Sequence, residues 1–291
     1  MTAADPLTGL LDALDLTPLD ADRFEARSVE RTRPRTFGGE LVAQALMAAG
    51  RTATGQAAHS LHVHFVAPGD PAVPMEYAVR RVRDGRRFAL RQVTGRQRGR
   101  DTLLATVSFA AAGDEPFTHQ QEVMPEVPGP EGLRTEIEQR HDVAHLMAPE
   151  DRVWLLAPRA IEVRQVSPVP LFDPPPGPPL AHSWLRAVGH LPDDPLLHLA
   201  VLAYASDTTL LDIGCYPHGL SWIDPRMEQA SLDHAMWFHR PLRADEWLLY
   251  AQVAPSLAAG RAYVRGSVFT RTGVLVASVA QEGLSRRRPS E

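Results

Sequence analysis

An internal repeat constrains the fold of this 291-residue chain more than any other feature. One helical pattern followed by strand patterns occurs twice, with strands expected at 59–65, 75–82, 88–97 and 102–110 and again at 231–238, 247–253, 262–270 and 274–281. The string FVAP in the first half corresponds to FHRP in the second, and RQRGRDTLLATVSF corresponds to FTRTGVLVASVAQ. Two like units can join their sheets at the edges and share one covered interior. We therefore predict an α+β fold of two tandem units, each a long helix packed on an antiparallel sheet.

The expected boundaries follow from changes in composition along the chain. The first unit covers residues 1–113, a loosely patterned connector covers 114–150, and the second unit covers 151–291. Weaker strand patterns at 153–163 and 183–188 predict the opening of the second unit, and the proline-rich stretch 171–180 predicts a second connector. Because one helix cannot cover both faces of a wide sheet, we expect the units to pack against each other.

Two helices stand out in the repeat. The first, FGGELVAQALMAAG, begins with two glycines and is rich in alanine, which lets a helix approach its neighbour closely. The second begins at Asp193-Asp194-Pro195 and runs through apolar residues to Asp207. A helix C-terminus disfavours an anion, so Asp207 either faces water or is shielded, in which case desolvation and the dipole are expected to raise its pKa.

Composition excludes several classes of function. The chain has no lysine, which excludes a P-loop lysine, a Schiff base and a Ser–Lys pair. The net charge of −5 is spread without long like-charge runs, so we expect neither a nucleic-acid nor a membrane partner, and Arg286–Arg288 is expected to be a solvated tail. Cys215 is the single cysteine, which excludes an intrachain disulfide and a thiolate zinc cluster. The aspartate-containing N-terminus does not resemble a signal peptide, so a cytoplasmic location is expected.

Other reactive side chains give poorer candidates. His59, His62 and His64 lack an acidic ligand motif nearby, so a polar strand face is favoured over a metal site. Cys215 and His218 lie in GCYPHG, which is typical of a turn, and an inert buried cysteine is favoured over a nucleophile. The adjacent pair Asp233-His234 is expected to point to opposite faces of a strand. No GxSxG nucleophile elbow occurs.

Five strings, in order, resemble one known family. They are FGGELVAQAL, HSLHVHFVAPGDP, LAYASD, SLDHAMWFHRP and VLVASVAQEG, and together they resemble the acyl-CoA thioesterase II family, which is TesB-like and has a double-hotdog fold. The resemblance implies hydrolysis of an acyl-CoA substrate to a free carboxylic acid and CoA, with no covalent acyl-enzyme, no cofactor and no metal. It also implies a role in fatty acid metabolism and a homo-oligomer, a dimer or larger.

The resemblance also implies three catalytic residues. The family's aspartate after LAYAS, its hydroxyl residue before LDH and its glutamine before EG correspond to Asp207, Ser231 and Gln281. Serine replaces the family's usual threonine, keeping the hydroxyl and losing the methyl that restricts its rotamer. Asp207 suits the role of a base, and the two neutral side chains suit holding a water. Taken singly, each could instead be structural: a loop cap, a turn residue and a frayed strand end.

Two features of the sequence allow more than one interpretation. The amides at Gly38-Gly39, at a helix N-terminus, could stabilise charge on a carbonyl oxygen, or these glycines could serve only a turn or close packing. The chain could also be a non-catalytic acyl-CoA or acyl-chain binding protein, or a hotdog enoyl-CoA hydratase or dehydratase. Release of CoA separates hydrolysis from both alternatives.

Overall fold

The structure is a computed structural model that describes residues 5–29, 35–113 and 116–288. The first half contains α1 (Pro6–Leu14), β1 (Thr17–Pro18), β2 (Arg23–Ala26), α2 (Gly38–Gly50), β3 (Ala57–Phe65), β4 (Met75–Asp84), β5 (Phe88–Gln97) and β6 (Arg100–Ala110). The second half contains α3 (Glu136–Val143), the short 3-10 helix η1 (Ala144–Leu146), α4 (Pro149–Leu155), β7 (Ile161–Gln165), β8 (Leu180–Ala187), α5 (Pro195–Ser206), the 3-10 helix η2 (Leu211–His218), β9 (Met227–Ser231), β10 (Asp233–Phe238), β11 (Leu248–Ala258), β12 (Arg261–Thr270) and β13 (Leu275–Arg287).

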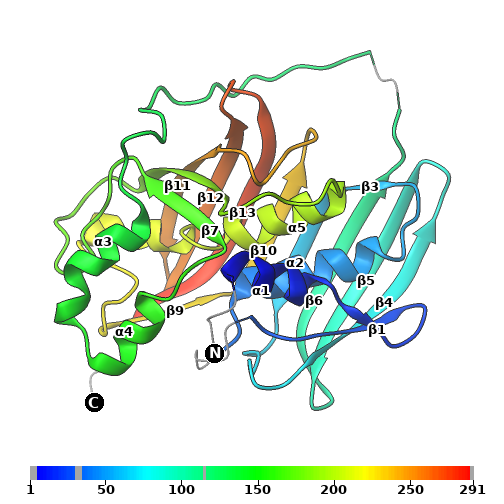
Figure 1. The fold of residues 1–291 in the computed structure, drawn as a ribbon, viewed down its shortest axis with the longest axis horizontal. Coiled ribbons are helices and arrows are strands. Elements are labelled where there is room, and N and C mark those ends of the chain that lie inside the picture. The colour runs from blue at the N-terminus through cyan, green and yellow to red at the C-terminus, as the bar shows by residue number, and fades with distance from the viewer. Residues whose placement is uncertain (1–4, 30–34, 114–115, 289–291) are drawn as a thin grey trace.

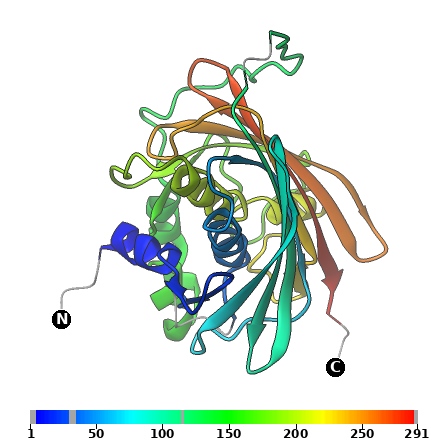
Figure 2. The ribbon, with the colours of Figure 1, turned by 90° about the vertical axis from the view of Figure 1, so that its right-hand side faces the viewer.

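Within the described ranges, the strands form one antiparallel sheet in the order β1-β2-β4-β5-β6-β3-β10-β13-β12-β11-β8-β7, with β9 also paired to β13. The two halves meet where β3 pairs with β10, with Leu61 opposite Met236. Figure 1 shows this continuous sheet, and Figure 2 shows it curving around α2 and α5. The predicted α+β fold of two joined helix-and-sheet units is confirmed, and the helices occupy the shared interior.

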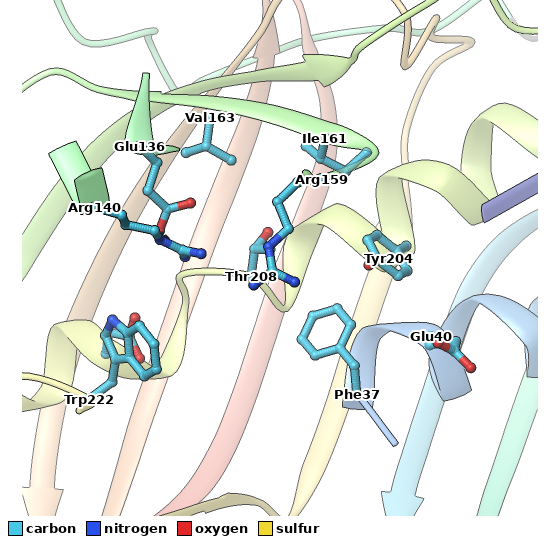
Figure 3. A pocket seen from close by; sticks show the side chains of 11 residues that line it. Phe37, Glu40, Glu136, Arg140, Arg159, Ile161, Val163, Tyr204, Thr208 and Trp222 are labelled. Carbon is cyan, nitrogen blue, oxygen red and sulfur yellow. Dashed lines mark hydrogen bonds and ion pairs between the residues drawn. The ribbon is translucent and has the colours of Figure 1, made fainter. Parts of the chain in front are cut away.

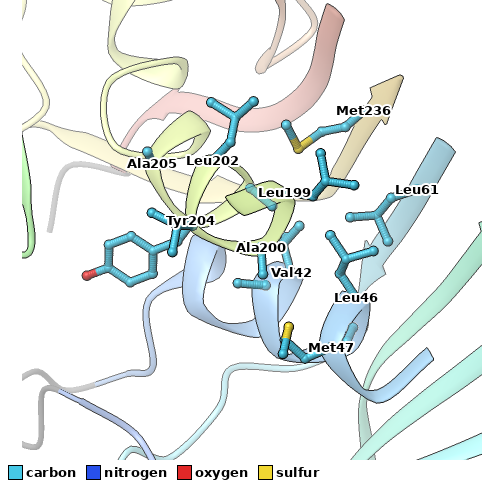
Figure 4. Packing of buried hydrophobic residues seen from close by; sticks show 14 of the residues in the cluster. Val42, Leu46, Met47, Leu61, Leu199, Ala200, Leu202, Tyr204, Ala205 and Met236 are labelled. Carbon is cyan, nitrogen blue, oxygen red and sulfur yellow. The ribbon is translucent and has the colours of Figure 1, made fainter. Parts of the chain in front are cut away.

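The helices α2 and α5 pack side by side and antiparallel in that interior (Figure 4). Two glycines of α2 allow the close approach, because a Cβ atom on Gly39 would collide with the Tyr204 carbonyl oxygen and one on Gly50 would collide with the Leu196 side chain. The first helix is therefore rich in small residues because another helix, rather than a sheet alone, lies against it. This contact brings the start of α2 to the end of α5.

Three predicted elements differ from the structure. The segment 153–163 is not a strand: Pro149 begins helix α4, where its missing N–H and fixed φ suit the first turn, and a strand starts only at Ile161. The stretch 231–238 is two strands rather than one, with β9 ending at Ser231 and β10 beginning at Asp233. The GCYPHG string belongs to η2 rather than to a simple turn.

The connector is more ordered than its composition predicts. Trp184 Nε1 donates a hydrogen bond to the Pro128 carbonyl oxygen at 2.8 Å, and the Leu275 amide donates to Gln120 Oε1 at 2.8 Å. A small apolar cluster forms there from Trp184, Leu249 and Phe269, with Met124, Val127 and Leu133 packed against it. This part of the connector therefore covers the face of the second unit's sheet that does not carry α5. The boundaries 1–113, 114–150 and 151–291 stay a prediction.

Among the residues that the structure describes, one helical stretch is long and apolar enough to cross a membrane by length and composition alone. It is 195–218, and 72% of its apolar window is buried inside the protein. This burial is what the central helix of a folded core requires, so the stretch is accounted for by packing between α2 and the sheet.

Candidate active site

The structure brings Asp207, Ser231 and Gln281 together at the end of α5. Asp207 caps the helix C-terminus, Ser231 ends β9, and Gln281 lies on β13 with 1% of its surface exposed. Gln281 Nε2 donates one hydrogen bond to Asp207 Oδ1 at 2.8 Å and another to Ser231 Oγ at 2.7 Å. The three predicted site residues therefore form one hydrogen-bonded group, although they come from three separate elements.

The Gln281 amide can take only one orientation in this group. Its two N–H bonds are used by Asp207 and Ser231, and rotating the amide would place Oε1 against the carboxylate. Gln281 Oε1 is buried and accepts no hydrogen bond from any residue in the described ranges. Buried acceptors ordinarily have a partner, and here an internal water would supply one.

The first turn of α2 faces the same carboxylate. A Cβ atom added to Gly38 would lie 2.7 Å from Asp207 Oδ2 and 3.3 Å from the Phe65 ring. Phe37, which precedes the helix, has no side-chain oxygen to cap the first-turn amides. Asp207 therefore lies between the negative end of α5 and the positive end of α2, whereas the sequence predicted only the first of these fields. Gly39, in contrast, is accounted for by its close contact with Tyr204.

His234 is the residue at this site that sequence reasoning missed. Its side chain is fully buried, with Nε2 at 2.9 Å from Ser206 Oγ and Nδ1 at 3.7 Å from Asp207 Oδ1. Burial lowers the pKa of His234 to about 4, so the imidazole is neutral at neutral pH. Asp233 points away and accepts a hydrogen bond from the Glu282 amide, as expected for adjacent strand residues. The sequence feature that could have identified it is the alternation of β10, which puts His234 on the same buried face as Met236.

A cleft of about 670 Å³ opens beside this group. Gly38, Asp207 and Ser231 line it, and exposed Arg35 lies among its lining residues. The rest of the wall is largely apolar, including Leu41, Phe65, Val66, Trp154, Leu211, Trp222 and Leu232. The volume is in the usual range for small-molecule sites, so the cleft can admit the reacting part of an organic substrate.

A smaller chamber of about 120 Å³ adjoins the cleft and shares Phe37, Asp212 and Trp222 with it. Figure 3 shows Arg140 and Arg159 reaching into this chamber, with the rings of Phe37 and Tyr204 on its other side. Burial raises the pKa of Asp212 well above its usual value, and nearby Glu136 adds to this effect. The chamber therefore has ionisable side chains in its lining, among them those of Glu136, Arg140, Arg159 and Asp212, beside its apolar residues.

The other candidates from the sequence lie elsewhere. Cys215 is buried, and burial raises the pKa of its thiol to about 11, whereas His218 in the same 3-10 helix is exposed. The ring of His62 packs edge-on against Trp237, on the β3–β10 pair. Within the described part of the chain, no three His, Cys, Asp or Glu side chains are grouped so that they could hold a metal ion.

Comparison with known proteins gives a consistent result. An acyl-CoA thioesterase family model matches residues 159–284, and a model of the acyl-CoA thioesterase N-terminal domain matches 28–110. The chain is 38% identical to human acyl-coenzyme A thioesterase 8 over 95% of this chain and 88% of that protein. It is 33% identical to acyl-CoA thioesterase 2 of Haemophilus influenzae, over 97% and 99% of the two chains. The crystal structure of acyl-CoA thioesterase II TesB2 from Mycobacterium marinum is also similar, with 37% identity, a TM-score of 0.78, and 96% and 98% of the chains covered.

Proposed function

Since the chain belongs to the acyl-CoA thioesterase family and is an acyl-CoA hydrolase, we propose that Asp207, Ser231 and Gln281 form its hydrolytic site. The observation that carries this proposal is the pair of hydrogen bonds from one buried amide to a carboxylate and a hydroxyl beside the cleft. A carboxylate fixed in this way cannot rotate freely, so it is held ready for proton transfer.

The reaction needs no covalent intermediate on the protein. A water oxygen attacks the thioester carbonyl carbon while Asp207 takes one proton from that water. The carbon–sulfur bond then breaks, and the proton passes from Asp207 to the departing sulfur, giving a carboxylic acid and CoA. Asp207 is suited to this role because its side chain is 7% exposed and borders the cleft.

Ser231 and Gln281 are proposed to orient the water. Because Ser231 Oγ accepts a hydrogen bond from Gln281, its own proton and its second lone pair are available to a water. Gln281 does not line the cleft, so it contributes by holding Asp207 and Ser231 in place. Neutral groups can hold a water in this way without competing with Asp207 for its proton.

The start of α2 is proposed to stabilise the charge that develops on the carbonyl oxygen. Gly38 borders the cleft and lies against Asp207, so the positive end of the helix faces the place where the thioester must react. Gly39→Ala is not an informative test, because its added methyl would disturb the Tyr204 contact whatever the role of the amide.

The wider biological setting is proposed on the same basis. We propose a cytoplasmic enzyme of fatty acid metabolism that forms a homo-oligomer and has neither a nucleic-acid nor a membrane partner. The net charge of −5 supports the last point, because nucleic acids and anionic membrane surfaces attract proteins with a net positive charge. Apolar side chains of the cleft suit an acyl chain, and Arg35 among its lining residues suits the phosphates of CoA.

The test is release of CoA from a panel of acyl-CoA thioesters. Wild type is expected to release CoA, and Asp207→Asn is expected to lose at least 100-fold in kcat, the usual order for a general base. Glu282→Gln is the matched control, because this neighbour of Gln281 is half-buried on the opposite face and pairs with Arg261. Activity retained in Asp207→Asn would refute the mechanism. Hydration of an enoyl-CoA without CoA release would instead support the hydratase alternative.

A further inference from the structure

His234 lies next to the proposed base, is fully buried and does not line the cleft. It belongs to β10, Asp207 follows α5, and the two side chains meet with Nδ1 and Oδ1 at 3.7 Å. No described residue forms a hydrogen bond with His234 Nδ1, although the side chain is completely buried. A buried ring nitrogen without a partner needs an explanation, because such a group ordinarily costs stability.

The Ser206 hydroxyl bears on the tautomer of this histidine. Its oxygen lies 2.9 Å from both the Ala203 carbonyl oxygen, in the last turn of α5, and His234 Nε2, and its single proton can be donated to only one of them. Donation to the Ala203 carbonyl is the bond that a serine in a helix commonly forms with its own backbone, and it leaves the hydroxyl oxygen to accept from Nε2–H. In this tautomer, on which the inference depends, the Nδ1 lone pair faces Asp207.

We propose that His234 is a positioning residue that increases the proton affinity of Asp207. A lone pair directed at a carboxylate disfavours its ionised form and favours the protonated form, so the base holds the water proton more strongly during attack. The proton still moves from water to Asp207 and then to the departing sulfur, and His234 gains no proton overall. This inference rests on the proposed function of Asp207.

Other titratable groups face Asp207 from the surrounding elements. Tyr250 on β11 donates to the Ser206 carbonyl oxygen at 3.1 Å, and burial raises its pKa well above the usual value. Asp212 on η2 also interacts with Asp207, and burial raises its pKa as well. On α2 and β13 the facing residues, Gly38 and Gln281, do not titrate. Among these facing groups in the described ranges, His234 is the one that directs a lone pair at the Asp207 carboxylate.

The test is the pH profile of kcat for His234→Gln. The glutamine amide can reach Ser206 in place of Nε2, but it has no counterpart to Nδ1. We expect the acidic limb to reach half-height about one pH unit lower than in wild type, with a plateau kcat about three- to tenfold smaller and an unchanged KM. His239→Gln is the matched control, because His239 Nε2 also lies 2.9 Å from a serine hydroxyl, that of Ser278, but His239 follows the end of β10, five residues along the chain from His234. The control is expected to keep the wild-type profile.

A second variant and a spectrum keep the inference testable if His234→Gln does not fold. Ser206→Ala removes the acceptor of the Nε2 proton, which frees the imidazole to carry its proton on Nδ1 and donate to Asp207, so the acidic limb is again expected to move to lower pH. The 15N spectrum of histidine-labelled wild type should show the Nε2–H tautomer at pH 7. An acidic limb that is unmoved or shifted upward in folded variants, or a His234 protonated on Nδ1, would overturn the inference. Loss of CoA release in Asp207→Asn supports the proposed function independently of these outcomes.

Discussion

Replacing Gln281 by glutamate tests the hydrogen-bonded group at its centre. The change keeps the size of the side chain but puts a second carboxyl where the amide now lies 2.8 Å from Asp207 Oδ1. At an effective dielectric constant of about 20, two unit charges at this distance repel by about 6 kcal/mol. Binding one proton at pH 7 costs only about 4 kcal/mol for an ordinary glutamate, so the pair is expected to share a proton.

This proton changes both stability and activity. The folded variant binds a proton that the unfolded chain releases, so its free energy of unfolding should be about 4 kcal/mol below wild type at pH 7. The deficit should shrink by about 1.4 kcal/mol for each pH unit down to about pH 4. Because the shared proton occupies the base, kcat at pH 7 should fall about 1,000-fold.

Urea unfolding between pH 4.5 and 8, together with CoA release, measures both effects. Gln281→Met is the matched control: it removes the same hydrogen bonds without adding a charge, so its loss of stability should not vary with pH. A Gln281→Glu protein whose stability follows the wild-type pH dependence would refute the inferred contact between position 281 and Asp207.

Three further predictions concern other contacts of the site. Ser231→Thr should keep kcat within about threefold, whereas Ser231→Ala leaves a Gln281 N–H without its acceptor and should lower kcat by about 10- to 100-fold in the CoA-release assay. The pKa of His234 is about 4 in the folded protein and 6.5 in the unfolded chain, so the unfolded chain binds the proton first as pH falls. Wild type should therefore lose up to about 3 kcal/mol of unfolding free energy between pH 6.5 and 4. In His234→Gln the unfolding free energy should fall less steeply over the same pH range. Gly266→Ala should cost about 1–3 kcal/mol in urea unfolding, because its methyl collides with the buried Tyr250 ring that supports the end of α5; an unchanged midpoint would contradict this packing.

The repeat allowed the two-unit fold to be predicted, because alternating strands and small-residue helices leave a local signal in the sequence. Resemblance to the family identified Asp207, Ser231 and Gln281, which the structure brings together. His234 was not predicted as part of this group, since its meeting with Asp207 depends on how β10 lies beside α5. Nothing in the local pattern of a strand specifies what packs on it.

The helix α4 and the connector show where local sequence patterns gave a wrong prediction. Val153 to Val163 contains enough apolar residues to look like a strand, but Pro149 starts a helix there. The connector was expected to be loose because it is polar and rich in proline. It is held instead by bonds such as that from Trp184 to Pro128, which join residues far apart in the chain. Such contacts are set by tertiary packing and have no periodic signature.

The antiparallel packing of α2 and α5 has a consequence for stoichiometry. At each end of the helix pair, the N-terminus of one helix lies beside the C-terminus of the other. The duplication therefore provides two places in every chain where an active site could form. At one end stands Asp207 with Gln281; at the other, Leu196 fills the space beside Gly50, and buried Phe109 takes the repeat position of Gln281. With the proposed site at Asp207, the duplication leaves one reactive end per chain, and titration with a non-hydrolysable acyl-CoA analogue should saturate at one equivalent.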